Sequence, residues 1–97
     1  MYGLTDNELN QLKAVLSAHK GVEKAILYGS RARGTNRPYS DIDISLIGSN
    51  LSLSDLAVID DQLDDLYLPY QIDLNAYHRI TNPALLHNIA TEGINIL

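Results

Sequence analysis

Two aspartates, Asp41 and Asp43, stand two positions apart in a segment where polar and apolar residues alternate. On a strand, residues two apart point to the same side, roughly 6.5–7 Å from each other along the chain. Their mutual repulsion is relieved by a cation, and Mg²⁺ prefers such oxygen ligands together with substrate phosphates. An Asp-x-Asp pair alone is more often a solvated strand face, so other residues have to decide between the two interpretations.

A third carboxylate, Asp73, lies on the polar side of a later alternating segment, between Ile72 and Leu74. If that segment forms a strand beside the one that carries Asp41 and Asp43, three carboxylates converge on one face. Such a set is what a two-metal phosphoryl-transfer site requires, where ions about 3.5–4 Å apart hold the attacking and leaving oxygens. The alternative is an exposed strand residue without a chemical role.

A Gly29-Ser30 step ends an apolar segment and opens a candidate helix. Glycine lets the backbone approach a ligand closely, and a helix N-terminus offers free N–H groups to phosphate. Arg31 and Arg33 follow at once and could reach phosphate oxygens. This patch beside the carboxylates suggests an anionic ligand and a metal, although a plain strand-to-helix turn with solvated arginines is the alternative.

The elements that must position these residues alternate between helices and strands. Thr5 and Glu8 fit a capping box at the start of the first helix, and Asn82-Pro83 fits the start of the last. The predicted elements are a helix from 6 that stops at Gly21, a strand 24–28, a short helix 30–35, a strand 41–46, a helix capped by Ser54 and reaching Leu66, a strand 71–76, a helix 83–92 and an edge strand 94–97. This order predicts an α/β fold with a single small mixed sheet packed with helices.

The bulk composition predicts a single domain over residues 1–97, because a chain of this length can bury one core. It contains no cysteine, which excludes disulfides and thiolate chemistry. No apolar run is long enough to span a membrane and no signal peptide is recognisable, so we expect a cytoplasmic protein. Acidic residues outnumber basic ones 12 to 7, so generic nucleic-acid binding is not expected.

Five aspartates gather on the helix predicted from Ser54 to Leu66: Asp55, Asp60, Asp61, Asp64 and Asp65. A charge run of this kind is typical of a solvated helix face. The alternative is a surface that receives a basic partner.

The glycine–serine step and the aspartate pair together form a longer motif. It consists of two runs, Gly29-Ser30-Arg31-Ala32-Arg33-Gly34 and Ser40-Asp41-Ile42-Asp43-Ile44. In this order and at this separation, the motif resembles the signature of the DNA polymerase beta-like nucleotidyltransferase superfamily. Within it, the chain is similar to the minimal nucleotidyltransferases, the MNT group of bacteria and archaea, and the resemblance covers nearly the whole chain.

The resemblance implies a nucleotidyltransferase fold and roles for particular residues. By resemblance, Gly29 and Ser30 bind nucleotide phosphates, and Asp41 and Asp43 bind two Mg²⁺ ions. Asp73 is the best match for the third carboxylate of the family, which completes the metal site and helps to activate the attacking hydroxyl.

Members that resemble this chain are paired with a small helical HEPN protein, a toxin, for which the MNT protein is the antitoxin. The resemblance therefore implies transfer of AMP from ATP to a tyrosine hydroxyl of the partner. Two alternatives stay open at this point: an antitoxin that inhibits by binding alone, and a nucleotidyltransferase for a small molecule. The intact set of three aspartates argues against the first, and the lack of room for an acceptor domain argues against the second.

Overall fold

A four-stranded mixed sheet in the order β3-β2-β1-β4 organises the chain in the computed structural model, which describes residues 1–97. The elements are α1 (Asp6–Ala18), β1 (Lys24–Tyr28), α2 (Ser30–Arg33), β2 (Ile42–Ile47), α3 (Leu53–Asp64), β3 (Ile72–Ala76), a 3-10 turn (Tyr77–Arg79), α4 (Pro83–Glu92) and β4 (Ile94–Asn95). The predicted α/β class, the single sheet and the order of elements are confirmed.

The strand pairings bring together segments that lie far apart in the sequence. β1 pairs antiparallel with both β2 and β4. β2 and β3 are parallel neighbours, and parallel strands need a crossover connection. Here α3 provides that crossover, so the segment that carries Asp73 comes to lie directly beside the segment that carries Asp43.

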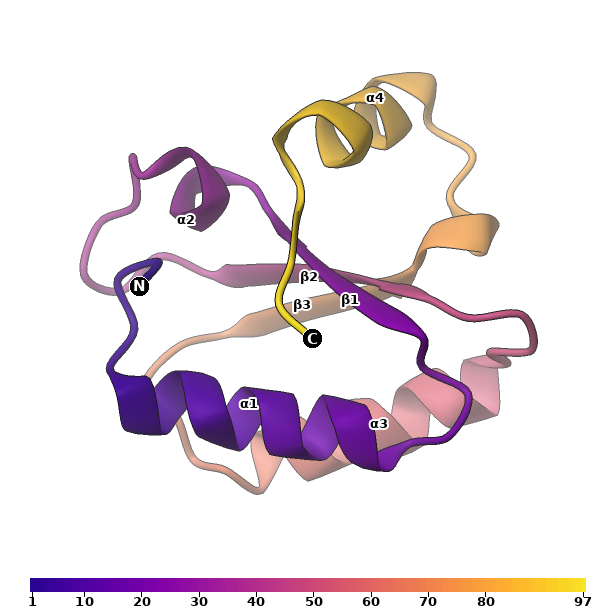
Figure 1. Cartoon of the computed structure of the whole chain (residues 1–97), viewed down its shortest axis with the longest axis horizontal. Coiled ribbons are helices and arrows are strands. Elements are labelled where there is room, and N and C mark those ends of the chain that lie inside the picture. The colour runs from indigo at the N-terminus through magenta and orange to yellow at the C-terminus, as the bar shows by residue number, and fades with distance from the viewer.

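The two faces of the sheet have different environments. α1 and α3 lie together on one side, whereas α2 and α4 lie on the other (Figure 1). The first side holds the core, because the alternation of each strand turns its apolar residues toward α1 and α3. Fully buried members of this core are Leu12, Leu16, Leu27, Ile42, Ile44, Leu46, Ile59 and Leu63. The polar residues of β2 and β3 consequently face the opposite, less covered side.

Helix α1 begins as predicted, whereas α3 begins at a different cap. The Thr5–Glu8 capping box is present, but α3 is capped by Ser52 and not by Ser54. The Ser52 hydroxyl accepts a hydrogen bond from the Asp55 N–H, and the Asp55 carboxylate accepts one from the Ser52 N–H. This second capping box starts the helix earlier than the apolar spacing indicated.

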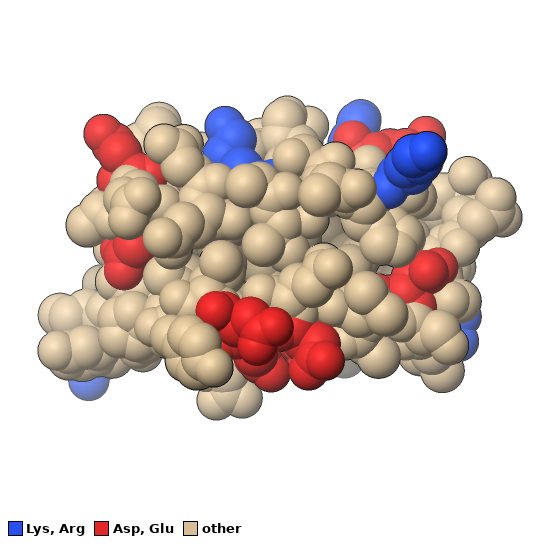
Figure 2. All heavy atoms as spheres, turned by 90° about the horizontal axis from the view of Figure 1, so that it is seen from below, with Lys and Arg blue, Asp and Glu red and all other residues tan.

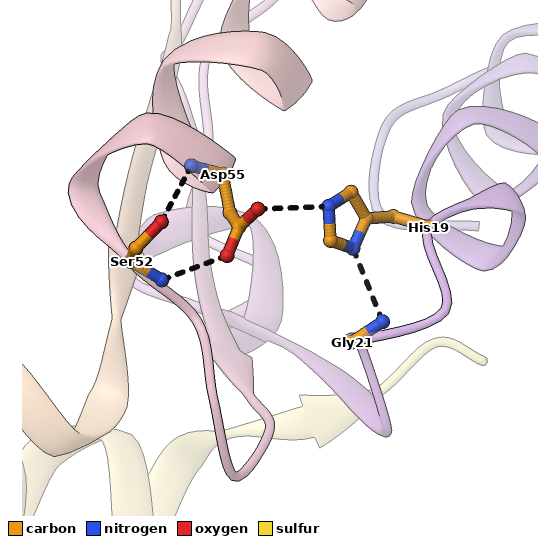
Figure 3. A network of polar contacts seen from close by, with 4 residues as sticks. All are labelled: His19, Gly21, Ser52 and Asp55. Atoms are coloured by element: carbon orange, nitrogen blue, oxygen red, sulfur yellow. Dashed lines mark hydrogen bonds and ion pairs between the residues drawn. The ribbon is translucent and has the colours of Figure 1, made fainter.

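His19 explains why α1 ends before Gly21. Its backbone is extended, and its ring Nδ1 accepts a hydrogen bond from the Gly21 N–H at 3.1 Å. Figure 3 shows that the same ring also reaches the Asp55 carboxylate, with 3.4 Å between Nε2 and Oδ1. The imidazole therefore links the end of α1 to the start of α3.

Two short elements are shorter than predicted. α2 stops at Arg33, because Gly34 takes the left-handed conformation, with φ of 78°. β4 has only two residues, paired with Ile26 and Leu27.

No helix in the structure is both long enough and apolar enough to cross a membrane; the longest, α1, has 13 residues.

Candidate active site

Asp43 and Asp73 are direct neighbours across the parallel strands β2 and β3. Both belong to the polar side of the sheet, where Asp43 is half-buried and Asp73 is exposed. Burial raises the pKa of the Asp43 carboxyl, and the negative charges of Asp73 and Asp41 raise it further, against the opposing effect of Arg33 and Arg31. The three predicted aspartates thus lie close enough to interact electrostatically.

The three carboxylates nevertheless do not gather around one point. No group of three or more histidine, cysteine, aspartate or glutamate side chains is arranged in the structure so that it could hold a metal ion. The type of donor fits a hard divalent cation, because carboxylate oxygens are its preferred ligands. The charge crowding around Asp43 is the feature that a bound cation would relieve.

Gly29 brings the backbone against Asp43. It takes φ of 76°, in the region that favours glycine, and a Cβ atom placed on it would collide with the Oδ2 atom of Asp43. The register explains this closeness, since Tyr28 pairs with Asp43 across β1 and β2. The predicted phosphate turn at Gly29 and Ser30 and the predicted metal carboxylate are therefore in immediate contact.

Arg31 occupies a different position from the one expected of a phosphate ligand. Its side chain is buried, with Nε and Nη2 donating to the Ser40 carbonyl at 3.1 and 2.7 Å and Nη1 donating to the Tyr2 carbonyl at 3.0 Å. The guanidinium also lies over the Tyr70 ring, 4.5 Å from its centroid. Because the guanidinium is already hydrogen-bonded and stacked within the protein, the geometry points to structural support of the loop before Asp41 and not to contact with a ligand.

Arg33 is the arginine that stays accessible. About half of its side chain is exposed (48 %), and its Nη1 forms an ion pair with the Glu92 carboxylate at 2.7 Å. This pair joins α2 to the end of α4. Arg31 and Arg33 look equivalent in the sequence but have opposite environments. Residues two positions apart in a helix point in different directions.

The comparisons with known proteins identify the family to which the chain belongs. Residues 10–97 match the family model described as Polymerase beta, Nucleotidyltransferase. The chain belongs to the polymerase beta nucleotidyltransferase family. This nucleotidyltransferase is 32 % identical over 92 residues to a Methanocaldococcus jannaschii protein named as a protein adenylyltransferase, covering 94 % of this chain and 97 % of that one.

Solved structures share the fold of this nucleotidyltransferase. One is a chain of a toxin–antitoxin crystal structure with AMP-PNP, with a TM-score of 0.72 at 21 % identity, covering 97 % of this chain and 73 % of that chain. A second belongs to the tri-AMPylated Shewanella oneidensis HEPN toxin in complex with MNT antitoxin. It has a TM-score of 0.72 at 17 % identity and covers 97 % and 72 % of the two chains.

The nucleotidyltransferase also carries polar residues near the aspartates that the sequence did not single out. Asn75 Nδ2 donates a hydrogen bond to the Tyr28 hydroxyl at 2.8 Å. Burial raises the pKa of Tyr28, and the charges of Asp43 and Asp73 raise it further, so its hydroxyl stays protonated beside them. Buried Ser45 is the register neighbour of Asn75. The available signal was the period of two, which places Ser45 and Asn75 on the side of Asp43 and Asp73.

Proposed function

We propose that this nucleotidyltransferase transfers AMP from ATP to a tyrosine hydroxyl of a partner HEPN toxin and thereby acts as its antitoxin. The observation that supports the proposal most directly is the contact between the Gly29 turn and Asp43, with Asp73 alongside. Nucleotide transfer needs a group that binds the phosphates and, beside it, carboxylates that can hold metal ions. The Methanocaldococcus jannaschii relative, named as a protein adenylyltransferase, and the AMPylated HEPN toxin of the structural neighbour support the choice of AMP and of a protein acceptor.

The proposal assigns a role to each residue. Gly29 and Ser30 receive the phosphates, with help from Arg33, and Arg31 positions the loop that leads to Asp41. Asp41, Asp43 and Asp73 are the residues that would hold Mg²⁺, which would supply positive charge to the phosphates. Asp73 orients the acceptor hydroxyl and takes up its proton.

The transfer step is a displacement at the α-phosphorus of ATP. The tyrosine oxygen forms a bond to this phosphorus, the bond between the α-phosphorus and the bridging oxygen to the β-phosphate breaks, and pyrophosphate leaves. The proton of the phenol passes to the Asp73 carboxylate. The protein supplies position and charge, which are the main contributions to phosphoryl transfer.

An open site favours a protein acceptor over a small molecule. Asp41 and Asp73 are exposed, so their carboxylates are open to solvent and are not enclosed around a small substrate. An acceptor residue that projects from another folded protein can reach such a site. The alternative of an antitoxin that acts by binding alone does not require three aspartates, and it is an outcome of the same test.

The decisive experiment combines the protein, ATP, Mg²⁺ and the product of the neighbouring gene, tested as the HEPN partner, and weighs that partner intact. We expect a gain of one or more AMP units on tyrosine, absent with Asp41→Asn. If the HEPN protein is neutralised without any gain of mass while ATP binding is confirmed, inhibition by binding is correct. If only small molecules become labelled, the small-molecule alternative is correct.

A further inference from the structure

A groove of about 320 Å³ runs between α3 and the edge strand β3. Its walls are formed by Leu56, Ala57 and Asp60 from the helix and by Ile72, Asp73 and Leu74 from the strand. Because Asp73 is part of this wall, the groove opens directly onto the candidate active site. The apolar members are only partly buried, so the groove has apolar surface that a ligand could cover.

The strand side of the groove also offers backbone hydrogen-bonding groups. β3 is the last strand on its side of the sheet. The Gln71 carbonyl accepts from the Ile42 N–H at 2.9 Å and so faces β2. Backbone groups alternate between the two sides of a strand, so those of Ile72 and Leu74 point to the free edge. An extended peptide can pair with such an edge.

The charge around the groove indicates which net charge a bound peptide would carry. Figure 2 shows one cluster of acidic side chains at the lower centre of this face, and the basic side chains lie elsewhere on the face. The exposed acids of α3 near the groove are Asp60, Asp61 and Asp64, and Asp73 adds a fourth carboxylate at the strand. A second copy of the chain would bring the same acidic rim against this one, whereas a basic segment would be attracted.

We infer that the groove between α3 and β3 is the docking site for an extended, basic segment of the acceptor protein, which adds as a strand to the edge of β3. Successive residues of an added strand alternate between two sides. Those on the α3 side cover Leu56 and Ala57 and place a lysine or arginine at Asp60. Those on the other side pass Asp73, where an acceptor hydroxyl would be presented. This inference rests on the proposed function only for the identity of the acceptor.

The test uses two matched substitutions on exposed helical alanines. Ala57→Tyr fills the groove, and Ala14→Tyr adds the same bulk to α1, away from it. Affinity for the partner used in the transfer experiment is measured by calorimetry, with and without ATP, and transfer is measured by intact mass. We expect Ala57→Tyr to weaken binding at least tenfold and Ala14→Tyr to leave it unchanged. Hydrogen exchange of the Ile72 and Leu74 amides should slow in the wild-type complex.

The outcomes separate this inference from the proposed function. Binding of Ala57→Tyr at wild-type strength, or no protection of the two amides, would overturn the docking site even if AMP is transferred. Groove-dependent binding without transfer would overturn the proposed function and leave the docking site supported. Unchanged melting temperatures for both variants would show that a lost affinity is not caused by misfolding.

Discussion

Asp43 on β2 and Asp73 on β3 are register partners across the one parallel strand pair of the sheet. Thirty positions separate them in the chain (73 − 43 = 30), yet the crossover through α3 makes them neighbours. Burial raises the pKa of Asp43, and the like charge of Asp73 raises it further, so the arrangement is unfavourable for the protein alone. A site that concentrates charge in this way is suited to a cationic ligand, and the predictions below start from this feature.

Removing the charge of Asp43 should separate chemistry from stability. Because the folded-state pKa is raised, the carboxylate opposes folding at pH values above its usual pKa of 3.8, and this effect disappears below that value. Asp43→Asn should therefore melt at a higher temperature than the wild type at pH 7 without metal, and transfer should fall at least about 100-fold. Calorimetric melting and a radiolabel assay measure the two effects. Glu23→Gln, at an exposed position just before β1 and outside the groove, is the control. Near-normal transfer by Asp43→Asn would contradict the metal assignment.

Asp73 should contribute more to the reaction than to nucleotide binding, because Asp41 and Asp43 remain to hold the ion that accompanies ATP. If it takes the proton of the acceptor, Asp73→Asn should bind Mg²⁺–ATP normally and transfer AMP about 10²–10⁴-fold more slowly. Calorimetry and single-turnover kinetics distinguish these steps. An unchanged transfer rate would remove Asp73 from the reaction and leave it as an exposed strand residue.

Two glycines with positive φ but different ψ, −155° at Gly29 and 17° at Gly34, allow a test of the phosphate turn. Gly29 has φ of 76° and Gly34 has φ of 78°, but only at Gly29 would a Cβ atom meet a neighbouring side chain, that of Asp43. Gly34→Ala, in the left-handed region, should lose about 1–2 kcal/mol from backbone strain. Gly29→Ala should lose more stability, because its combination of φ and ψ is essentially restricted to glycine. Only Gly29→Ala should also lose transfer activity, because Asp43 has to move. Equal activity of the two variants would argue against the contact having a role.

The two arginines of α2 should behave in opposite ways. Arg31→Ala removes a buried side chain and its three hydrogen bonds to the partly buried Tyr2 and Ser40 carbonyls. We expect a loss of about 3 kcal/mol in the free energy of unfolding. Arg33→Ala breaks one partly exposed ion pair, which contributes less than about 1 kcal/mol. It should instead raise the KM for ATP. Denaturant unfolding and steady-state kinetics measure these effects, and a stable Arg31→Ala variant with a raised KM would restore Arg31 as a phosphate ligand.

Much of this arrangement was predictable because short-range patterns determine it. The period of two at Ile42–Leu46 and Ile72–Ala76 predicted both strands and the side on which Asp43 and Asp73 lie. The environment of Arg31 was not predictable, since Tyr2, Ser40 and Tyr70 approach it only through tertiary folding. The cap of α3 was misplaced for a local reason: Ser52 and Ser54 are both suitable caps, and the carboxylate of Asp55 favours Ser52.

The Asp55 capping network predicts a specific pH dependence of stability. Hydrogen bonds from the Ser52 backbone and hydroxyl lower the pKa of Asp55, and the nearby His19 lowers it further. A lowered folded-state pKa means that the stabilisation is present above the usual pKa of 3.8 and is lost as the pH falls through the folded-state value. The melting temperatures of wild type and Asp55→Asn should therefore differ most near neutral pH and converge in acid. A constant difference across this range would show that ionisation of Asp55 is not involved.

The crossover through α3 also sets the order in which the site can be assembled. As the chain leaves the ribosome, β1 and β2 can pair with each other before β3 has been made, and they carry the Gly29 turn, Asp41 and Asp43. Asp73 joins them only after α3 has packed and β3 has emerged. A nascent chain that ends within α3 therefore holds the nucleotide-facing half of the site without its third carboxylate. Catalytic competence is gained late in synthesis, at the step that closes the parallel strand pair.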